Sequence, residues 1–95
     1  MAEAGIGVSR RRVSIVNERG LHARAAARFV QLAERFDAEI LVSKDDIVVP
    51  GTSIMGLLML AAPRGSELEL QASGREAEPA LAALADLIAA GFDER

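Results

Sequence analysis

Two hydrophobic periods alternate along the chain, and their order limits the folds that it can adopt. Some segments alternate apolar and polar residues, as strands with one buried face do, and others repeat apolar residues every three or four positions, as helices do. The clearest strand is Glu67 to Ala72, where leucine alternates with polar residues. The pattern predicts strands over 10–16, 38–43, 47–49 and 67–72, and helices over 23–35, 54–60 and 76–90.

The resulting order is β-α-β-β-α-β-α. Its strands are too close together for a doubly wound parallel sheet, because each parallel pair needs a long crossover connection. We therefore expect an α+β fold with an antiparallel sheet and helices packed on one face. A ferredoxin-like split sheet is equally compatible with the pattern. Periodicity alone does not choose the order of the strands.

Composition narrows the range of functions. Ninety-five residues, of which 51% are hydrophobic, suffice for one domain, which we place at 10–95 after a flexible tail over 1–9. With no cysteine and one histidine, a zinc or other metal site is not expected, and neither is a cofactor. The longest apolar run, 54–62, is too short to cross a membrane, and the first residues do not resemble a signal peptide. We expect a cytoplasmic protein without membrane insertion.

Charge is unevenly distributed between the two ends of the chain. Residues 1–35 carry a formal net charge of +4 and residues 36–95 carry −7. Such polarity can steer anionic ligands or acidic protein surfaces toward the basic end. Nucleic acid is the rival ligand. It is not expected, because the chain is acidic overall and has three Phe and no Tyr or Trp to stack on bases.

His22 is the only histidine, and it stands where a glycine loop turns into the first turn of a helix. Imidazole is a nucleophile that is substantially unprotonated near neutral pH. A helix N-terminus leaves backbone N–H groups free and attracts anions, so a phosphoryl group on this ring would be stabilised there and by Arg24. The alternative is an ordinary surface histidine at a helix start. Arg28, one turn later, either contacts partners or solvates the helix.

The second predicted helix carries two further features. Ser53, or Thr52, is placed to cap its N-terminus. We expect Leu57 and Leu60 to pack inward. Ile54, Met55 and Leu58 are then left as an exposed docking patch beside His22, although a helix that is apolar nearly all round can also be buried on every side.

Two motifs resemble those of HPr, the histidine phosphocarrier family of the phosphoenolpyruvate-dependent phosphotransferase system. They are Gly20-Leu21-His22-Ala23-Arg24 and, about thirty residues later, Ser53-Ile54-Met55-Gly56. The similarity spans about residues 12–91 in order and length. Three further segments, 36–39, 57–60 and 91–94, look most like the nitrogen-regulatory branch of the family.

The resemblance implies an open-faced β-sandwich of four antiparallel strands with three helices on one side. It implies that His22 accepts a phosphoryl group on Nδ1 from phospho-enzyme I, which phosphoenolpyruvate charges, and passes it to a histidine on an enzyme IIA-type protein. Arg24 would stabilise the transferring group. Ser53 aligns with the serine that HPr kinase/phosphorylase modifies in many bacteria. Such a protein is a carrier and not an enzyme in isolation, and a monomer suits one face presented to successive partners.

One residue departs from the family pattern. Ala25 stands where the family usually has proline, so the first helical turn keeps an N–H donor that proline would remove. We expect transfer chemistry to survive this change. Two alternatives remain open: a regulatory interaction module that signals by its phosphorylation state, and an unrelated α/β binding domain, for instance for RNA, in which His22 is incidental.

Overall fold

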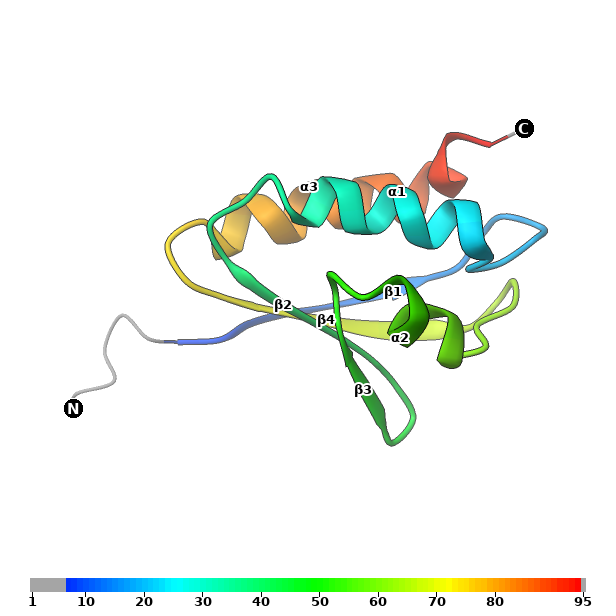
Figure 1. The fold of residues 1–95 in the computed structure, drawn as a ribbon, viewed down its shortest axis with the longest axis horizontal. Helices are drawn as coiled ribbons and strands as arrows, with labels where there is room; N and C mark the ends of the chain where they lie inside the picture. The colour runs from blue at the N-terminus through cyan, green and yellow to red at the C-terminus, as the bar shows by residue number, and fades with distance from the viewer. Residues whose placement is uncertain (1–6, 95) are drawn as a thin grey trace.

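A four-stranded antiparallel sheet forms the base of the molecule (Figure 1). The computed structural model describes residues 7–94. Its strands follow the spatial order β1-β4-β2-β3, which settles the pairing that periodicity left open. Most of the predicted tail, residues 1–6, lies outside the described residues, and Ser9 is already the first residue of the first strand. The strands are β1 (Ser9–Ser14), β2 (Glu39–Lys44), β3 (Ile47–Pro50) and β4 (Glu67–Ser73).

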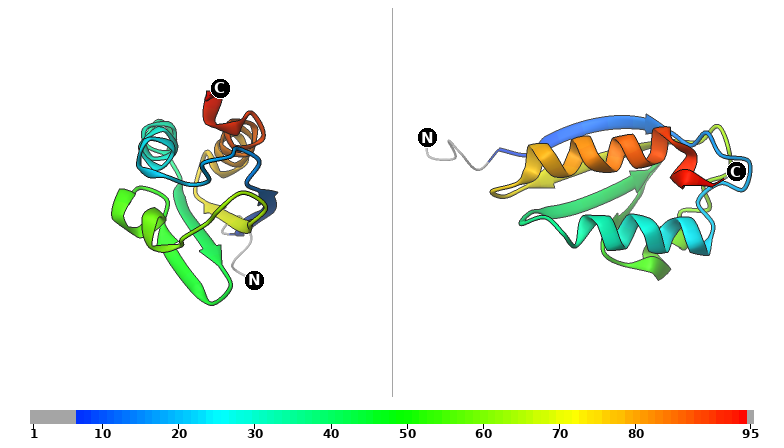
Figure 2. Two further views of the ribbon diagram at one scale, coloured as in Figure 1. Left: turned by 90° about the vertical axis from the view of Figure 1, so that its right-hand side faces the viewer. Right: turned by 90° about the horizontal axis from the view of Figure 1, so that it is seen from above.

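Two long helices lie side by side over one face of this sheet (Figure 2). They are α1 (Ala23–Ala33) and α3 (Ala77–Ala89), and a shorter helix, α2 (Ile54–Met59), packs against α1 and β3. A final 3-10 turn, η1 (Gly91–Asp93), follows α3. The predicted α+β fold, with the order β-α-β-β-α-β-α, is confirmed.

One continuous core fills the space between helices and sheet. The inward faces of the strands are apolar, because every second residue of β4 and β2 points toward the helices. The apolar stripes of both long helices are buried in this core. The stripe of α1 consists of Ala26, Phe29, Val30 and Ala33, and that of α3 includes Leu81, Leu84 and Ile88.

The edge strand β1 differs in composition from its neighbour β4. β4 lies between β1 and β2 and alternates buried with partly exposed residues, whereas β1 begins with a run of arginines at the edge. Charged side chains on an edge strand oppose pairing with another chain. The arginines therefore suit β1 to its outer position.

Small differences from the predicted boundaries occur at turns. Lys44, which lies between the strands predicted over 38–43 and 47–49, is the last residue of β2 and pairs with Ile47. The turn is tight because Asp45 adopts a left-handed conformation, with φ of 54°, which aspartate tolerates better than most residues. Gly91 takes the predicted position after the last helix, with φ of 65°.

Candidate functional site

His22 is the residue immediately before α1, with extended backbone angles and a ring that does not cap the helix. Its carbonyl accepts the first helical hydrogen bond, from the N–H of Ala26 at 2.8 Å. The N–H groups of Ala23 to Ala25 precede that bond, so they are the donors that a helix start leaves free for an anion. The sequence prediction of a histidine at a helix N-terminus is confirmed.

A tight turn fixes the loop that leads into His22. Gly20 has φ of 69°, and a side chain there would come within 2.6 Å of the Ala62 carbonyl oxygen. Leu21 is buried, and its N–H donates to that same carbonyl at 2.9 Å. Only glycine combines the positive φ with this close approach, which explains why a glycine stands two residues before the histidine.

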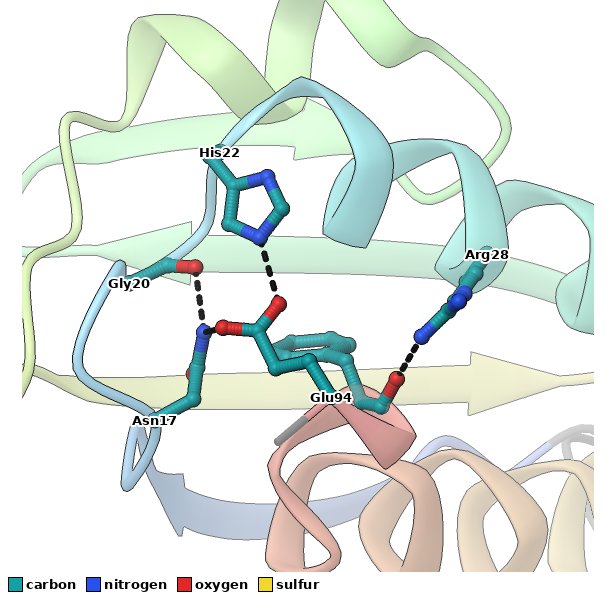
Figure 3. A network of polar contacts seen from close by, with 6 residues as sticks. Asn17, Gly20, His22, Arg28 and Glu94 are labelled. Carbon is teal, nitrogen blue, oxygen red and sulfur yellow. Dashed lines mark hydrogen bonds and ion pairs between the residues drawn. The ribbon is translucent and has the colours of Figure 1, made fainter.

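The C-terminal segment folds back onto this loop and brings Glu94 to the His22 ring (Figure 3). The carboxylate atom Oε2 lies 2.6 Å from Nε2 of His22. The other oxygen, Oε1, accepts from Nδ2 of Asn17 at 2.9 Å, and the same amide nitrogen donates to the Gly20 carbonyl at 2.8 Å. Both contacts of this atom are with oxygen acceptors. The Asn17 side chain is therefore oriented with its NH₂ group, and not its oxygen, toward Gly20 and Glu94.

The charge state of Glu94 follows from these contacts. The hydrogen bonds from Asn17 and His22 lower the pKa of the Glu94 carboxyl below its usual range, with smaller contributions from the charges of His22 and Arg19. An ionised carboxylate only accepts hydrogen bonds, so Nε2 of His22 carries the proton in this contact. In neutral imidazole the lone pair is then on Nδ1.

Arginines surround the site on the side of α1 and the preceding loop. Arg24 is exposed and, with Arg19 and Arg28, lines a hollow of about 640 Å³ that also reaches Asn17 and Glu94. Arg28 is partly buried, and its guanidinium donates to the backbone carbonyl of Phe92, a contact that neither expected role includes. It therefore anchors the C-terminal turn as well as facing the hollow.

The capping role of Ser53 and the exposure of the residues after it agree with the sequence prediction at all but one of the residues named there. The Ser53 hydroxyl accepts from the N–H of Gly56 at 2.9 Å, so Ser53, not Thr52, caps α2. Leu57 and Leu60 are buried. The expected exposure of Leu58 is wrong, because it packs partly buried against the core. The exposed apolar side chains of α2 are Ile54 at 40%, Met55 at 71% and Met59 at 70%.

Sequence reasoning missed Asn17 and Glu94 as parts of the site. Their contact spans 77 residues, and hydrophobic periodicity carries no information on such a pairing. One signal was available: Phe92 is an aromatic residue just past the glycine that ends α3, and it is fully buried. An apolar anchor after a helix end indicates that the chain turns back onto the core.

Within residues 7–94, no group of three or more His, Cys, Asp or Glu side chains is arranged to hold a metal ion. Likewise, none of the helices described there is both long and apolar enough to cross a membrane.

Comparison with known proteins is consistent with the sequence resemblance. A family model described as "PTS HPr component phosphorylation site" matches residues 9–90. The chain is 48% identical over 82 residues to a phosphocarrier protein HPr of Neisseria meningitidis, which covers 86% of the chain and 92% of the relative. It is 41% identical over 83 residues to the phosphocarrier protein NPr of Escherichia coli, with the same coverage. A crystal structure of HPr from Thermoanaerobacter tengcongensis superposes with a TM-score of 0.87 at 42% identity, covering 92% of this chain and 98% of that one.

Proposed function

This chain belongs to the HPr family of phosphocarriers, and on that premise we propose that His22 accepts and donates a phosphoryl group. The donor is phospho-enzyme I, charged by phosphoenolpyruvate, and the acceptor is a histidine on an enzyme IIA-type protein. The observation that carries the proposal is the His22 ring itself. It stands at the N-terminus of α1 with Nε2 engaged by Glu94, which leaves Nδ1 available as the nucleophile.

The transfer is a substitution at phosphorus. The Nδ1 lone pair of His22 attacks the phosphorus, the bond from phosphorus to the donor nitrogen breaks, and its electron pair returns to the donor ring. The product is a phosphoramidate whose ring nitrogen is a good leaving group once the ring is protonated, so the phosphoryl group can be passed on. Arg24 and the first N–H groups of α1 stabilise the oxygens of the transferring group.

Partners would dock on the exposed surface of α2. Ile54, Met55 and Met59 expose apolar side chains there, and α2 packs beside α1, which carries the histidine at its start. Exposed apolar patches of this kind typically mark protein-interaction sites. Arg28 contributes positive charge at the neighbouring hollow, which favours an acidic partner surface.

Ser53 is a candidate site of regulatory phosphorylation by HPr kinase/phosphorylase. Its partly exposed side chain caps α2 within the docking surface. A phosphate there would add about −1.5 to −2 charges beside the apolar side chains and weaken docking to enzyme I. Phosphorylation with kinase and ATP that produces an acid-stable phosphate in wild type and none in Ser53→Ala supports this role. Equal labelling of the two proteins contradicts it.

The carrier role is tested by labelling. Wild type incubated with enzyme I and phosphoenolpyruvate should acquire an acid-labile, base-stable phosphate, and His22→Ala should acquire none. No uptake by wild type, or equal uptake by His22→Ala, would overturn the proposal. Onward transfer to a IIA-type protein separates a carrier from the alternative, a regulatory module that uses the same α2 surface: a module becomes phosphorylated but does not pass the group on.

A further inference from the structure

The C-terminal turn holds Glu94 against His22 more firmly than a surface contact requires. The side chains of His22 and Glu94 are only 16% and 19% exposed. Each oxygen of the carboxylate has its own partner, Nε2 of His22 and Nδ2 of Asn17. Asn17 is itself buried and bonded to the Gly20 carbonyl, so the carboxylate is tied to the loop that carries the histidine (Figure 3).

The backbone before Glu94 adopts a costly conformation. Gly91, Phe92 and Asp93 have φ of 65°, 57° and 62°, three consecutive residues in the left-handed region. For a residue other than glycine this costs roughly 1–2 kcal/mol. Two interactions offset the cost: the ring of Phe92 is fully buried, and Arg28 of α1 donates to the Phe92 carbonyl. Backbone strain of this sort gathers at functional sites, where the surrounding structure enforces it.

We propose that Glu94 is a positioning residue for phosphoryl transfer, which keeps the proton of His22 on Nε2 and stabilises the positive charge that the ring acquires in the reaction. This inference rests on the proposed function and adds to it a residue that the family match does not include. The match ends at residue 90, and Glu94 lies beyond it.

The charge balance of the reaction explains the need for a carboxylate. When Nδ1 of a neutral imidazole forms a bond to phosphorus, the ring keeps its Nε2 proton and becomes positively charged. A carboxylate 2.6 Å from Nε2 compensates that charge as it develops. On onward transfer the bond from Nδ1 to phosphorus breaks, its electron pair returns to Nδ1, and the ring becomes neutral again with its proton still on Nε2.

The other charged groups near the ring do not supply this compensation. Arg19, Arg24 and Arg28, which line the adjacent hollow, are cationic and stabilise the phosphoryl oxygens rather than the ring. Glu18 also lines the hollow, but its side chain is exposed. In the part of the chain that the structure describes, Glu94 is the carboxylate paired with His22. Its lowered pKa keeps it ionised at neutral pH.

The test uses two variants and one matched control. Glu94→Ala removes both the hydrogen-bond acceptor and the charge, whereas Glu94→Gln keeps an acceptor and removes the charge alone. The control is Asp93→Asn, which makes the same change of charge at the neighbouring exposed residue, and asparagine tolerates its left-handed backbone. Because His22 is the only histidine, its two ring nitrogens can be observed by nitrogen NMR without interference from other rings.

We expect wild type, Glu94→Gln and Asp93→Asn to place the proton on Nε2, and Glu94→Ala to show a mixture of tautomers. Both Glu94 variants should lower kcat for phosphorylation by phospho-enzyme I by about ten- to a hundredfold, the effect of losing a charge-assisted hydrogen bond. KM should change little, because the carboxylate faces the ring and not the partner. Asp93→Asn should match wild type.

Two outcomes separate the inference from the function on which it rests. If wild type takes up no phosphate, the carrier function is wrong and the role of Glu94 falls with it. If wild type is phosphorylated on His22 while Glu94→Ala matches Asp93→Asn in tautomer and kcat, the positioning role alone is wrong. A purely structural role for Glu94 predicts lower stability of both Glu94 variants with unchanged kcat for the folded protein, which also overturns it.

Discussion

The N–H of Leu21 donates to the carbonyl of Ala62 at 2.9 Å, and this bond ties the loop that carries His22 to the segment after α2. The first motif is therefore joined, through the backbone, to the segment that follows the helix of the second motif. One supplies the reactive ring, and the other supplies the helix that we propose as docking surface. The close approach depends on Gly20, which lies beside both Ala62 and Pro63.

Replacement of Gly20 by alanine should destabilise the protein by roughly 2 to 5 kcal/mol. A Cβ would meet the Ala62 oxygen at 2.6 Å in a backbone conformation that alanine avoids. Gly65→Ala is the matched control, since Gly65 also has a positive φ but nothing lies within 4 Å of its added Cβ. That variant should lose only about 1 to 2 kcal/mol. Urea denaturation measures the stability of both variants. Equal losses would show that the close approach to the Ala62 oxygen does not add to the destabilisation.

Arg24→Ala should slow phosphorylation of His22 by about ten- to a hundredfold through the loss of charged hydrogen bonds to phosphoryl oxygens. The free energy of unfolding of this variant should stay within about 0.5 kcal/mol of that of wild type, because the Arg24 side chain is exposed. Arg35→Ala removes another exposed arginine, beyond the far end of α1, and should leave the rate unchanged. Rates measured with phospho-enzyme I decide the point. If both variants slow transfer equally, long-range charge rather than contact is responsible.

Ser53→Ala should lose about 1 kcal/mol of stability, because it removes the acceptor that caps α2 through Gly56. Ser53→Asp keeps an oxygen acceptor at the same position and should retain most of that stability while adding negative charge. Thermal denaturation checks the first effect, and phosphorylation by enzyme I checks the second. We expect Ser53→Asp to raise KM for the protein substrate. A normal KM would contradict a switch at this serine.

The two faces of α2 should respond in opposite ways to substitution. Leu57→Ala should cost about 2 to 5 kcal/mol, because this side chain is fully buried. Met55→Ala should change stability by no more than about 0.5 kcal/mol, since 71% of the residue is exposed, but should weaken binding to enzyme I. Calorimetric titration with enzyme I tests the second effect. Unchanged affinity of Met55→Ala would show that enzyme I docks on another surface.

Acid should release the C-terminal turn. The pKa of Glu94 is lower in the folded protein than in the unfolded chain, so its contacts stabilise the fold above the unfolded pKa and are lost as the pH falls through the folded one. The difference in stability between wild type and Glu94→Gln should therefore be largest near neutral pH and shrink in acid. Urea denaturation at several pH values measures it. A difference that is independent of pH would mean that the ionised carboxylate is not the stabilising form.

Local patterns predicted most of the fold because the core is built from regular stripes. The alternation of β4 and the stripe of α1 around Phe29 mark inward faces by their spacing alone. Leu58 was assigned to the wrong environment because α2 is short and apolar on several sides, so its spacing does not distinguish a half-buried flank from an exposed one. The contact of Arg28 with Phe92 was not predicted, because an arginine in a polar stripe gives no indication of a backbone acceptor in a distant turn.

By itself the sequence determined the elements, the inward faces and the placing of His22 at a helix start, since each depends on residues within a few positions of one another. Only the tertiary structure decided the strand order, with β4 between β1 and β2, and the pairing of His22 with Glu94 across 72 residues. Both depend on how the whole chain closes around one core. Period and propensity describe the face of an element but not the element that it meets, so the partner of His22 becomes visible only in the folded chain.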